Sequence, residues 1–345
     1  MSVKGRVPGP DRPRSAPTGS EPVTSPRPLP VARRMRDLGE RVVGLFRHPV
    51  WNIGVVHEPI HAFLESESRP EIHWFPPPRS NTYLADPFGL ARDSEVVVFC
   101  EEYDYLSGRG TLCGIELSGR GPSSPPRAAF DLPVHASYPF VFSFDGEAYC
   151  VPETSRAREV SLFKATEFPF RWAKVATILP DLAGLDNTVF PYNGRWWLAC
   201  TDYERNPDSD LMLWHAANPK GPWEPHAANP VKSDSGSSRP AGTPFLHKGH
   251  LYRPAQDSSR TYGGRIVLNR VRRLTTRDFE EEPAAVIEPY PGSPYPAGVH
   301  TISSAGDVTL IDGHRFTFID RAFSSSLHRE LAHARTWASS LLQRG

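Results

Sequence analysis

The stretch Asp86-Pro87-Phe88 to Cys100-Glu101-Glu102 holds two short apolar strands joined by a turn, and it ends on an acid. Three later stretches repeat this order, from Tyr138 to Glu153, from Asp186 to Asp202 and from Ala241 to Asp257. The steps from opening residue to closing acid are 16, 15, 16 and 16 residues, and the closing acids recur about every 50 residues, a period typical of propellers. A repeat of strands and turns with almost no helix predicts the blade of a β-propeller.

A fifth, shorter unit follows from Gly298 to Phe318, in which Asp312-Gly313 is interpreted as a turn between two strands. We expect the strand that begins at Trp51 to pair with this unit, because closing the ring removes two open sheet edges. The predicted fold class is all-β, a five-bladed β-propeller. The first strands of all blades then surround one central funnel, and a functional site is expected where they converge.

Four segments are expected along the chain. Residues 1–31 form a disordered Pro/Arg-rich tail, since eight of the first 30 residues are proline and no apolar run is present. Residues 32–50 suit a short amphipathic helix and linker, which we expect to pack on its own domain rather than on a membrane surface. The propeller covers 51–320, and a C-terminal helix covers 321–345.

The composition excludes some partners and leaves others open. Lys and Arg together number 39, as do Asp and Glu, so no overall basic field predicts a nucleic-acid partner. No apolar window is long enough for a transmembrane segment, and no apolar stretch near the start predicts a secretory signal. The cysteines occupy strand positions without metal-ligand spacing and are expected to be buried free thiols. The chain is therefore expected to be cytoplasmic, with no cofactor and no metal.

Several strings resemble one known family. They are His135-Ala136-Ser137-Tyr138-Pro139-Phe140 with Pro152-Glu153, Pro219-Lys220-Gly221-Pro222-Trp223-Glu224, Arg239-Pro240-Ala241-Gly242, and Gln256-Asp257 with Tyr262-Gly263. They resemble the propeller domain that forms the N-terminal part of plant glucosamine inositolphosphorylceramide transferases, over about Trp51 to Asp320. In those proteins the glycosyl transfer is attributed to a separate C-terminal domain. The architecture is also similar to five-bladed glycoside hydrolases such as arabinanases and invertases.

The resemblance to those hydrolases implies three funnel carboxylates: a base or nucleophile, a pKa-tuning aspartate and a general acid. Asp86 stands where the first is expected, and Asp186 stands at the same point of blade three, where it suits the tuning role. Blade four reads Ser238-Arg239-Pro240-Ala241-Gly242 where those hydrolases carry glutamate. Glu153, at the end of the second strand of blade two, is the candidate replacement acid. Glu102, Glu153, Asp202 and Asp257 are interpreted as equivalent positions, and such acids could instead accept hydrogen bonds that hold neighbouring blades together.

The remaining candidates are substrate-binding residues. Arg239 either pairs with Asp86 or Asp186 and silences it, or holds a phosphate or carboxylate of a ligand. The other substrate-binding candidates are Tyr138, His300, Asp257 and Tyr262. The residues do not decide whether the chain is an enzyme, and two hypotheses follow. It is a glycoside hydrolase-like enzyme acting on a carbohydrate or anionic glycoconjugate, or a non-catalytic glycan-binding domain that works with a separate glycosyltransferase.

Overall fold

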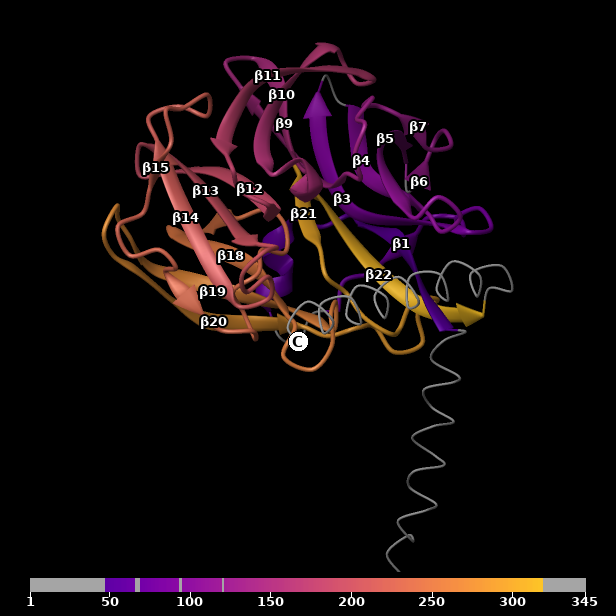
Figure 1. The fold of residues 1–345 in the computed structure, drawn as a ribbon. Coiled ribbons are helices and arrows are strands. Elements are labelled where there is room, and N and C mark those ends of the chain that lie inside the picture. Colours follow the sequence, from indigo (N-terminus) through magenta and orange to yellow (C-terminus); the bar gives the residue numbers. More distant parts are fainter. Residues whose placement is uncertain (1–46, 66–68, 93–94, 120, 319–345) are drawn as a thin grey trace, which may run out of the picture. The chain divides into compact units, whose positions relative to one another are not determined.

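The computed structural model describes residues 47–65, 69–92, 95–119 and 121–318. The predicted tail, residues 32–46 of the segment predicted as an amphipathic helix and linker (32–50), and the C-terminal helix lie outside these residues. Residues 47–50 of that segment belong to a strand. The described chain forms five antiparallel sheets arranged as the blades of a propeller, as Figure 1 shows. The predicted all-β, five-bladed fold is confirmed. Within the described residues, no helix is long and apolar enough to span a membrane.

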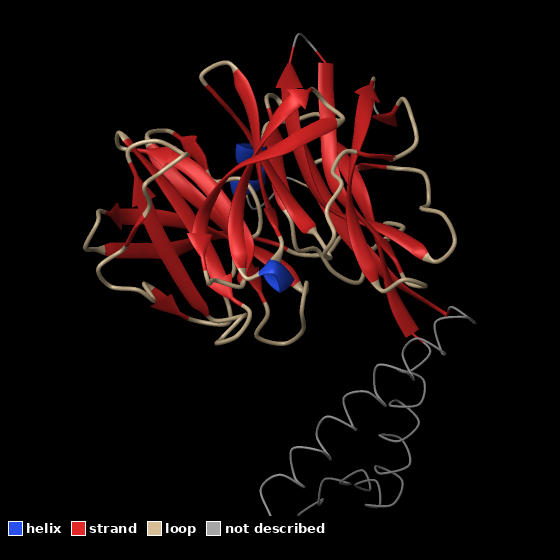
Figure 2. Ribbon diagram, turned by 45° about the horizontal axis from the view of Figure 1, so that its top comes forward, coloured by secondary structure: helices blue, strands red, loops and turns tan. Residues whose placement is uncertain are grey.

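Blades one to four each come from one continuous stretch of chain, and Figure 2 shows that strands make up almost all of the described residues. In Figure 1, β3, β12 and β21 lie toward the centre of the ring. The strand bounds are as follows: in blade one β3 (Thr82–Arg92), β4 (Glu95–Asp104), β5 (Arg109–Ser118), β6 (Gly121–Pro122) and β7 (Arg127–Ala128); in blade two β8 (Ser137–Phe144), β9 (Glu147–Glu153), β10 (Glu159–Glu167) and β11 (Arg171–Pro180); in blade three β12 (Gly184–Tyr192), β13 (Arg195–Asp202), β14 (Asp210–Ala216), β15 (Glu224–Pro225) and β16 (Lys232–Ser233); in blade four β17 (Phe245–His247), β18 (His250–Asp257), β19 (Arg265–Leu274) and β20 (Phe279–Ile287).

The fifth blade is built from both ends of the described chain. Strand β1 (Arg47–Val56) pairs antiparallel with β22 (Val308–Phe318) along its whole length, and β2 (His73–Trp74) and β21 (Ile302–Ala305) complete the sheet. The expected pairing of the Trp51 strand with the last unit is therefore confirmed, and the strand begins at Arg47. Two short 3-10 helices lie outside the sheets, η1 (Ile60–Leu64) and η2 (Ser155–Ala157).

One local prediction is wrong. Asp312-Gly313 is not a turn, because β22 continues through both residues and pairs them with Ile53 and Asn52 of β1. An Asp-Gly pair usually marks a hairpin, but here the partner strand β1 keeps the chain extended. Gly313 is required at its position, since a Cβ there would lie 2.6 Å from the Trp74 ring.

The core lies between the blades. Its largest cluster of buried side chains joins blades one, two and three and includes Phe88, Phe99, Tyr138, Cys150 and Leu198. Cys100, Cys113, Cys150 and Cys200 are all buried free thiols, as expected. Because apolar packing between blades fixes the inner strands, the residues at the openings of those strands are held in one place around the funnel.

Candidate functional site

The opening residues of the first three blades share an unusual backbone conformation. Asp86, Tyr138 and Asp186 have positive φ angles of 53°, 45° and 52°, and each lies at a register shift between the first two strands of its blade. A positive φ is uncommon outside glycine and is unfavourable for a bulky residue such as tyrosine. Conformations of this kind persist where the surrounding structure enforces them and gather at functional sites. The bulge turns the three side chains toward the funnel.

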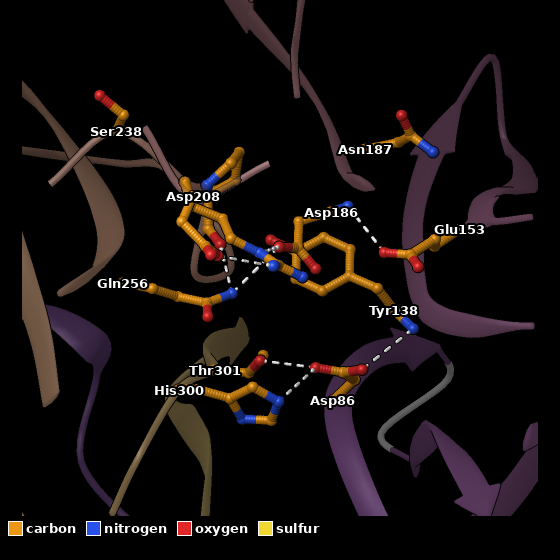
Figure 3. Close-up of polar contacts among 12 residues, drawn as sticks. Asp86, Tyr138, Glu153, Asp186, Asn187, Asp208, Ser238, Gln256, His300 and Thr301 are labelled. Carbon is orange, nitrogen blue, oxygen red and sulfur yellow. Dashed lines mark hydrogen bonds and ion pairs between the residues drawn. The ribbon is translucent and has the colours of Figure 1, made fainter. Parts of the chain in front are cut away.

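An inner cluster of four residues joins blades one and five, and it consists of Asp86, His300, Thr301 and Asp312. His300 lies between the two carboxylates, with Nδ1 2.6 Å from Asp312 Oδ2 and Nε2 3.4 Å from Asp86 Oδ1. Thr301 donates its hydroxyl to Asp86 Oδ1 at 2.8 Å, and the backbone N–H of Tyr138 donates to Asp86 Oδ2 at 3.2 Å, as Figure 3 shows. Asp312 accepts the backbone N–H groups of His300 and Thr301.

The titration of this cluster follows from burial and charge. Burial alone would lower the pKa of His300, but the carboxylates of Asp312 and Asp86 raise it to about 9. Burial raises the pKa of Asp86 to about 6, against the opposing effect of His300. The cluster therefore holds a protonated histidine at neutral pH, with both Asp86 oxygens occupied by donors.

The same residues are the natural place to look for a metal. Asp86, His300 and Asp312 offer ligand atoms within 4.8 Å of one another, and no other such group of three occurs among the described residues. His300 Nδ1 and Asp312 Oδ2 form an ion pair at 2.6 Å, and a cation there would require His300 to lose its proton. The observed arrangement is that of an internal ion pair.

Glu153 and Asp186 form a second carboxyl pair, on blades two and three. The backbone N–H of Asp186 donates to Glu153 Oε2 at 3.1 Å, and both side chains are buried. Burial and the neighbouring charge of Asp186 raise the pKa of Glu153 to about 8, although Arg239 opposes the shift. Glu153 is thus protonated at neutral pH, and the Asp186 carboxylate beside it is paired with Arg239.

Arg239 is committed to this pair. Its Nε lies 2.5 Å from Asp186 Oδ2 and its Nη1 lies 3.0 Å from Asp208 Oδ1. Gln256 donates to the same Asp186 oxygen at 3.0 Å, and the Tyr262 ring lies 5.1 Å from the guanidinium carbon. Two outcomes were predicted for Arg239, and in the structure it pairs with Asp186. Asp186 Oδ1 takes part in no hydrogen bond among the described residues.

A mouth pocket of about 610 Å³ opens beside this pair. Two tyrosines reach into it from blades three and four, with Tyr203 65 % exposed and Tyr262 49 % exposed. Its arginines are Arg156, Arg158 and Arg239; Arg158 pairs with Glu204, whereas Arg156 forms no ion pair with any described residue. The pocket is lined by His135, Glu153, Ser155, Arg156, Arg158, Ala183, Leu185, Tyr203, Glu204, Pro207, Asp208, Arg239 and Tyr262.

The structure brings most of the predicted site residues together. Glu153, Arg239 and Tyr262 line the mouth pocket, and Asp186 lies directly behind them. Asp86 and His300 belong to the inner cluster. Tyr138 is fully buried, and its hydroxyl accepts the backbone N–H of Gly242 and contacts the Thr188 hydroxyl. Asp257 does not line the mouth pocket, since its carboxylate is occupied by Ser259 and Arg265.

The predicted equivalence of the closing acids is wrong by one residue in blades one and three. In blade three Asp202 pairs with Gly184, and Thr201 holds the position that matches Glu153. In blade one Ala85 pairs with Glu101 just before the bulge, as Ser137 pairs with Glu153, so that Glu101 and not Glu102 matches Glu153. Glu102 instead contacts Arg79 and Cys113 away from the funnel. Glu101-Glu102 offers two adjacent acids, and only the strand register decides between them.

Asp312 is the other residue that sequence reasoning missed. The sequence predicts a turn at this residue. The signal that could have identified it is its place immediately after the apolar strand Val308–Ile311, where the other blades carry an acid. Glu101 and Asp312 are both buried, and both face the carboxyls already predicted.

Comparison with known proteins identifies relatives. The family model described as "Glucosamine inositolphosphorylceramide transferase 1, N-terminal" matches residues 77–289. Glucosamine inositolphosphorylceramide transferase 1 of Oryza sativa subsp. japonica is 32 % identical over 209 residues, which cover 59 % of this chain and 28 % of the relative. The Arabidopsis thaliana protein of the same name is 30 % identical over 207 residues, covering 58 % and 27 %. The chain thus spans less than a third of the length of these relatives.

Two solved structures are similar at low identity. The α-L-arabinofuranosidase PaAbf62A of Podospora anserina aligns with a TM-score of 0.49 and 12 % identity, over 67 % of this chain and 90 % of that one. Zg3597, a family 117 glycoside hydrolase of Zobellia galactanivorans, aligns with a TM-score of 0.48 and 14 % identity, over 68 % and 85 %.

Proposed function

The chain belongs to the family of glucosamine inositolphosphorylceramide transferase 1 N-terminal domains, and from this membership and the geometry of the mouth pocket we propose that it is a carbohydrate-active protein that cleaves a glycosidic bond of a glycoconjugate. The observation that carries the proposal is the Glu153–Asp186 pair. The backbone N–H of Asp186 donates to Glu153 at a pocket that Glu153 lines, burial raises the pKa of Glu153 to about 8, and the Asp186 carboxylate is paired with Arg239. A buried carboxyl that keeps its proton at neutral pH is the usual candidate for a general acid.

In this proposal Glu153 is the general acid. It gives its proton to the oxygen of the leaving group as the bond from that oxygen to the anomeric carbon breaks, and a water oxygen then bonds to the anomeric carbon. The proton that the water loses passes to the Asp186 side chain, whose Oδ1 has no hydrogen-bond partner among the described residues. Asp86 is buried with both oxygens occupied, and its role is to hold the openings of blades one, two and five in place.

The pocket suits a sugar ring that carries an anionic group. Tyr203 and Tyr262 are exposed aromatic faces on which a ring can stack. Arg156 lines the same pocket and is available for a phosphate or carboxylate, since Arg239 is held by Asp186 and Asp208. The expected grip on an anion therefore moves from Arg239 to Arg156.

The test is hydrolysis of a glycoside library by the wild type and by Glu153→Gln. Loss of a general acid lowers the rate by roughly 10²- to 10⁴-fold, while binding of the same glycosides stays measurable. Tyr290→Phe is a matched control, because that hydroxyl lies in a different cavity. A wild type inert on every glycoside, or a Glu153→Gln protein as active as the wild type, would overturn the proposal.

A second function, glycan binding without catalysis, is supported by one observation. Blade four has Ala241 and not an acid at its opening, and Arg239 forms an ion pair with Asp186 at 2.5 Å. If the chain is a binding domain, it should bind anionic glycans without turnover. Glu153→Gln should then leave the affinity for these glycans unchanged, and Arg156→Gln should lower that affinity. The partner that would then supply the chemistry is a separate glycosyltransferase.

A further inference from the structure

Glu101 occupies a position at which, in two other blades, an acid forms a hydrogen bond to the neighbouring blade. In blade two, Glu153 accepts the backbone N–H of the residue that opens blade three, Asp186, at 3.1 Å. In blade five, Asp312 accepts the backbone N–H of the residue that opens blade one, Asp86, at 3.2 Å. Each of these acids therefore ties its own blade to the next one round the ring.

In blade one the same task is done by another residue. The backbone N–H of Tyr138, which opens blade two, donates to Asp86 at 3.2 Å and not to Glu101. Glu101 is 4 % exposed, and its Oε1 has no hydrogen-bond partner among the described residues. Tyr83 is a hydrogen-bond partner of this carboxyl, but leaving one of its buried oxygens without a partner still costs free energy. The position of Glu101 is therefore not explained by the linkage that explains Glu153 and Asp312.

The space around this carboxyl is specifically maintained. Gly110 faces Oε1, and a Cβ on that residue would lie only 2.0 Å from the oxygen. The backbone N–H of Gly110 donates to Nδ1 of His135 at 2.8 Å. Burial and the positive charges of Arg156 and Arg109 lower the pKa of His135 to about 4, so the ring is neutral and carries its proton on Nε2.

His135 connects Glu101 to the mouth pocket. The His135 ring lines the pocket, and Nε2 lies 3.8 Å from Glu101 Oε1, which is too far for a direct hydrogen bond. An N–H donor and a carboxyl oxygen therefore lie near each other without a hydrogen bond between them. One oxygen atom about 2.8 Å from each would complete both hydrogen bonds.

We propose that Glu101 and His135 form a hydroxyl-binding subsite of the mouth pocket, in which one ligand hydroxyl accepts from His135 Nε2–H and donates to Glu101 Oε1. The ligand class is a polyhydroxylated ring, either a sugar or a cyclitol. Because Oε1 is buried, the hydroxyl enters together with an outward movement of the His135 ring, which is 22 % exposed. The subsite rests on the proposed function only in using the same pocket, since it takes no part in bond cleavage.

Burial and the charges of Asp86 and Glu153 raise the pKa of Glu101 well above its usual value, which favours the neutral form of its carboxyl. Glutamine is the neutral isostere of that form and keeps the carbonyl oxygen. Glu101→Gln is therefore expected to preserve the subsite, whereas Glu101→Leu removes the acceptor and keeps a side chain of similar volume. This pair of variants separates loss of the hydrogen bond from loss of shape.

The experiment follows the ring signals of His135 by NMR, assigned with His135→Asn, during titration with myo-inositol and with methyl α-D-glucopyranoside. Neither probe needs to be cleaved for binding to be seen. The wild type and Glu101→Gln are expected to show a saturable shift with dissociation constants within about threefold of each other, and Glu101→Leu is expected to bind roughly tenfold more weakly, as loss of one buried hydrogen bond implies. Thermal unfolding of Glu101→Leu checks that the variant is folded.

The outcomes distinguish this subsite from the proposed catalysis. Glu153→Gln should keep the His135 shift even where it abolishes turnover, and a wild type without turnover that still shows the shift would overturn only the catalytic proposal. A shift of equal affinity in Glu101→Leu, or no shift in the wild type with either probe, would overturn the subsite.

Discussion

The inner cluster and the Glu153–Asp186 pair are made of the same kinds of side chain, but they differ in their surroundings. In the inner cluster, a protonated His300 lies between two carboxylates, and both oxygens of Asp86 accept hydrogen bonds. At the mouth, Glu153 faces a pocket, and Asp186 keeps one oxygen without a hydrogen-bond partner among the described residues. The difference teaches that a buried acid at a propeller opening is either part of the ring's linkage or available to a ligand, and that its partners decide which.

The largest expected effect is on stability, from breaking the inner cluster. His300→Gln removes the cation that Asp86 and Asp312 share, and leaving buried charge uncompensated typically costs about 3–5 kcal/mol. His215→Gln is a matched control, because His215 is also buried but forms no ion pair among the described residues. Urea unfolding at pH 7 measures both. Equal losses in the two variants would show that the cluster is not the linkage described here.

The pH dependence of stability sharpens the same point. The folded pKa of His300 is raised from 6.5 to about 9, so its stabilisation is fully present below pH 6.5 and is lost as the pH rises through 9. The shift corresponds to roughly 3 kcal/mol in total. Burial also raises the pKa of Glu153, to about 8, which removes stability as the pH rises to that point.

Between pH 8 and 9 His300 contributes a fall of at most about 1.4 kcal/mol per pH unit, in addition to any fall from Glu101 and the buried cysteines, whose pKa values are also raised. The wild type should therefore lose stability over this interval, and His300→Gln should lose less. Denaturant midpoints at half-unit pH steps make the comparison, and parallel curves for the two proteins would contradict the assignment.

A smaller effect is expected from Arg239, at the boundary between the two regions. Arg239→Gln removes a charge-assisted hydrogen bond to Asp186, worth about 2 kcal/mol of stability. Because Arg239 lowers the pKa of Glu153, its loss should raise that pKa further and move the alkaline limb of activity upward in pH. Arg265→Gln, which breaks the half-exposed pair with Asp257, is the control and should cost less than about 1 kcal/mol. An alkaline limb that moved down would contradict the assignment of Glu153 as the acid.

The contrast between these regions also explains what the sequence could predict. The blade repeat, the pairing of the Trp51 strand with the last unit and the positions of Asp86 and Asp186 at blade openings follow from spacing and strand pattern. The match to residues 77–289 confirms the family drawn from the motifs. These features are local or periodic, and a sequence displays them directly.

The partners of the funnel acids are not local. Which of Glu101 and Glu102 faces the funnel depends on strand register, and a shift of one residue reverses the face. Asp312 was misassigned because Asp-Gly is a turn signal, which the pairing of β22 with β1, more than 250 residues away in sequence, overrides. Arg239 could be expected to pair with an acid, but its choice of Asp186 and Asp208 depends on three blades meeting at one point.

The smallest effect tests the mouth as a sugar-stacking surface. Tyr203 is 65 % exposed and lines the mouth pocket, so Tyr203→Ala should leave unfolding unchanged and weaken glycan binding by about 1 kcal/mol, or roughly fivefold. Phe316 is an exposed aromatic residue on β22 that does not line this pocket, and Phe316→Ala should leave binding unchanged. Calorimetric titration with a neutral and an anionic glycan from the same series should show equal losses for Tyr203→Ala, because stacking does not depend on charge. A loss confined to the anionic ligand would instead mean that Tyr203 acts by positioning the neighbouring arginines.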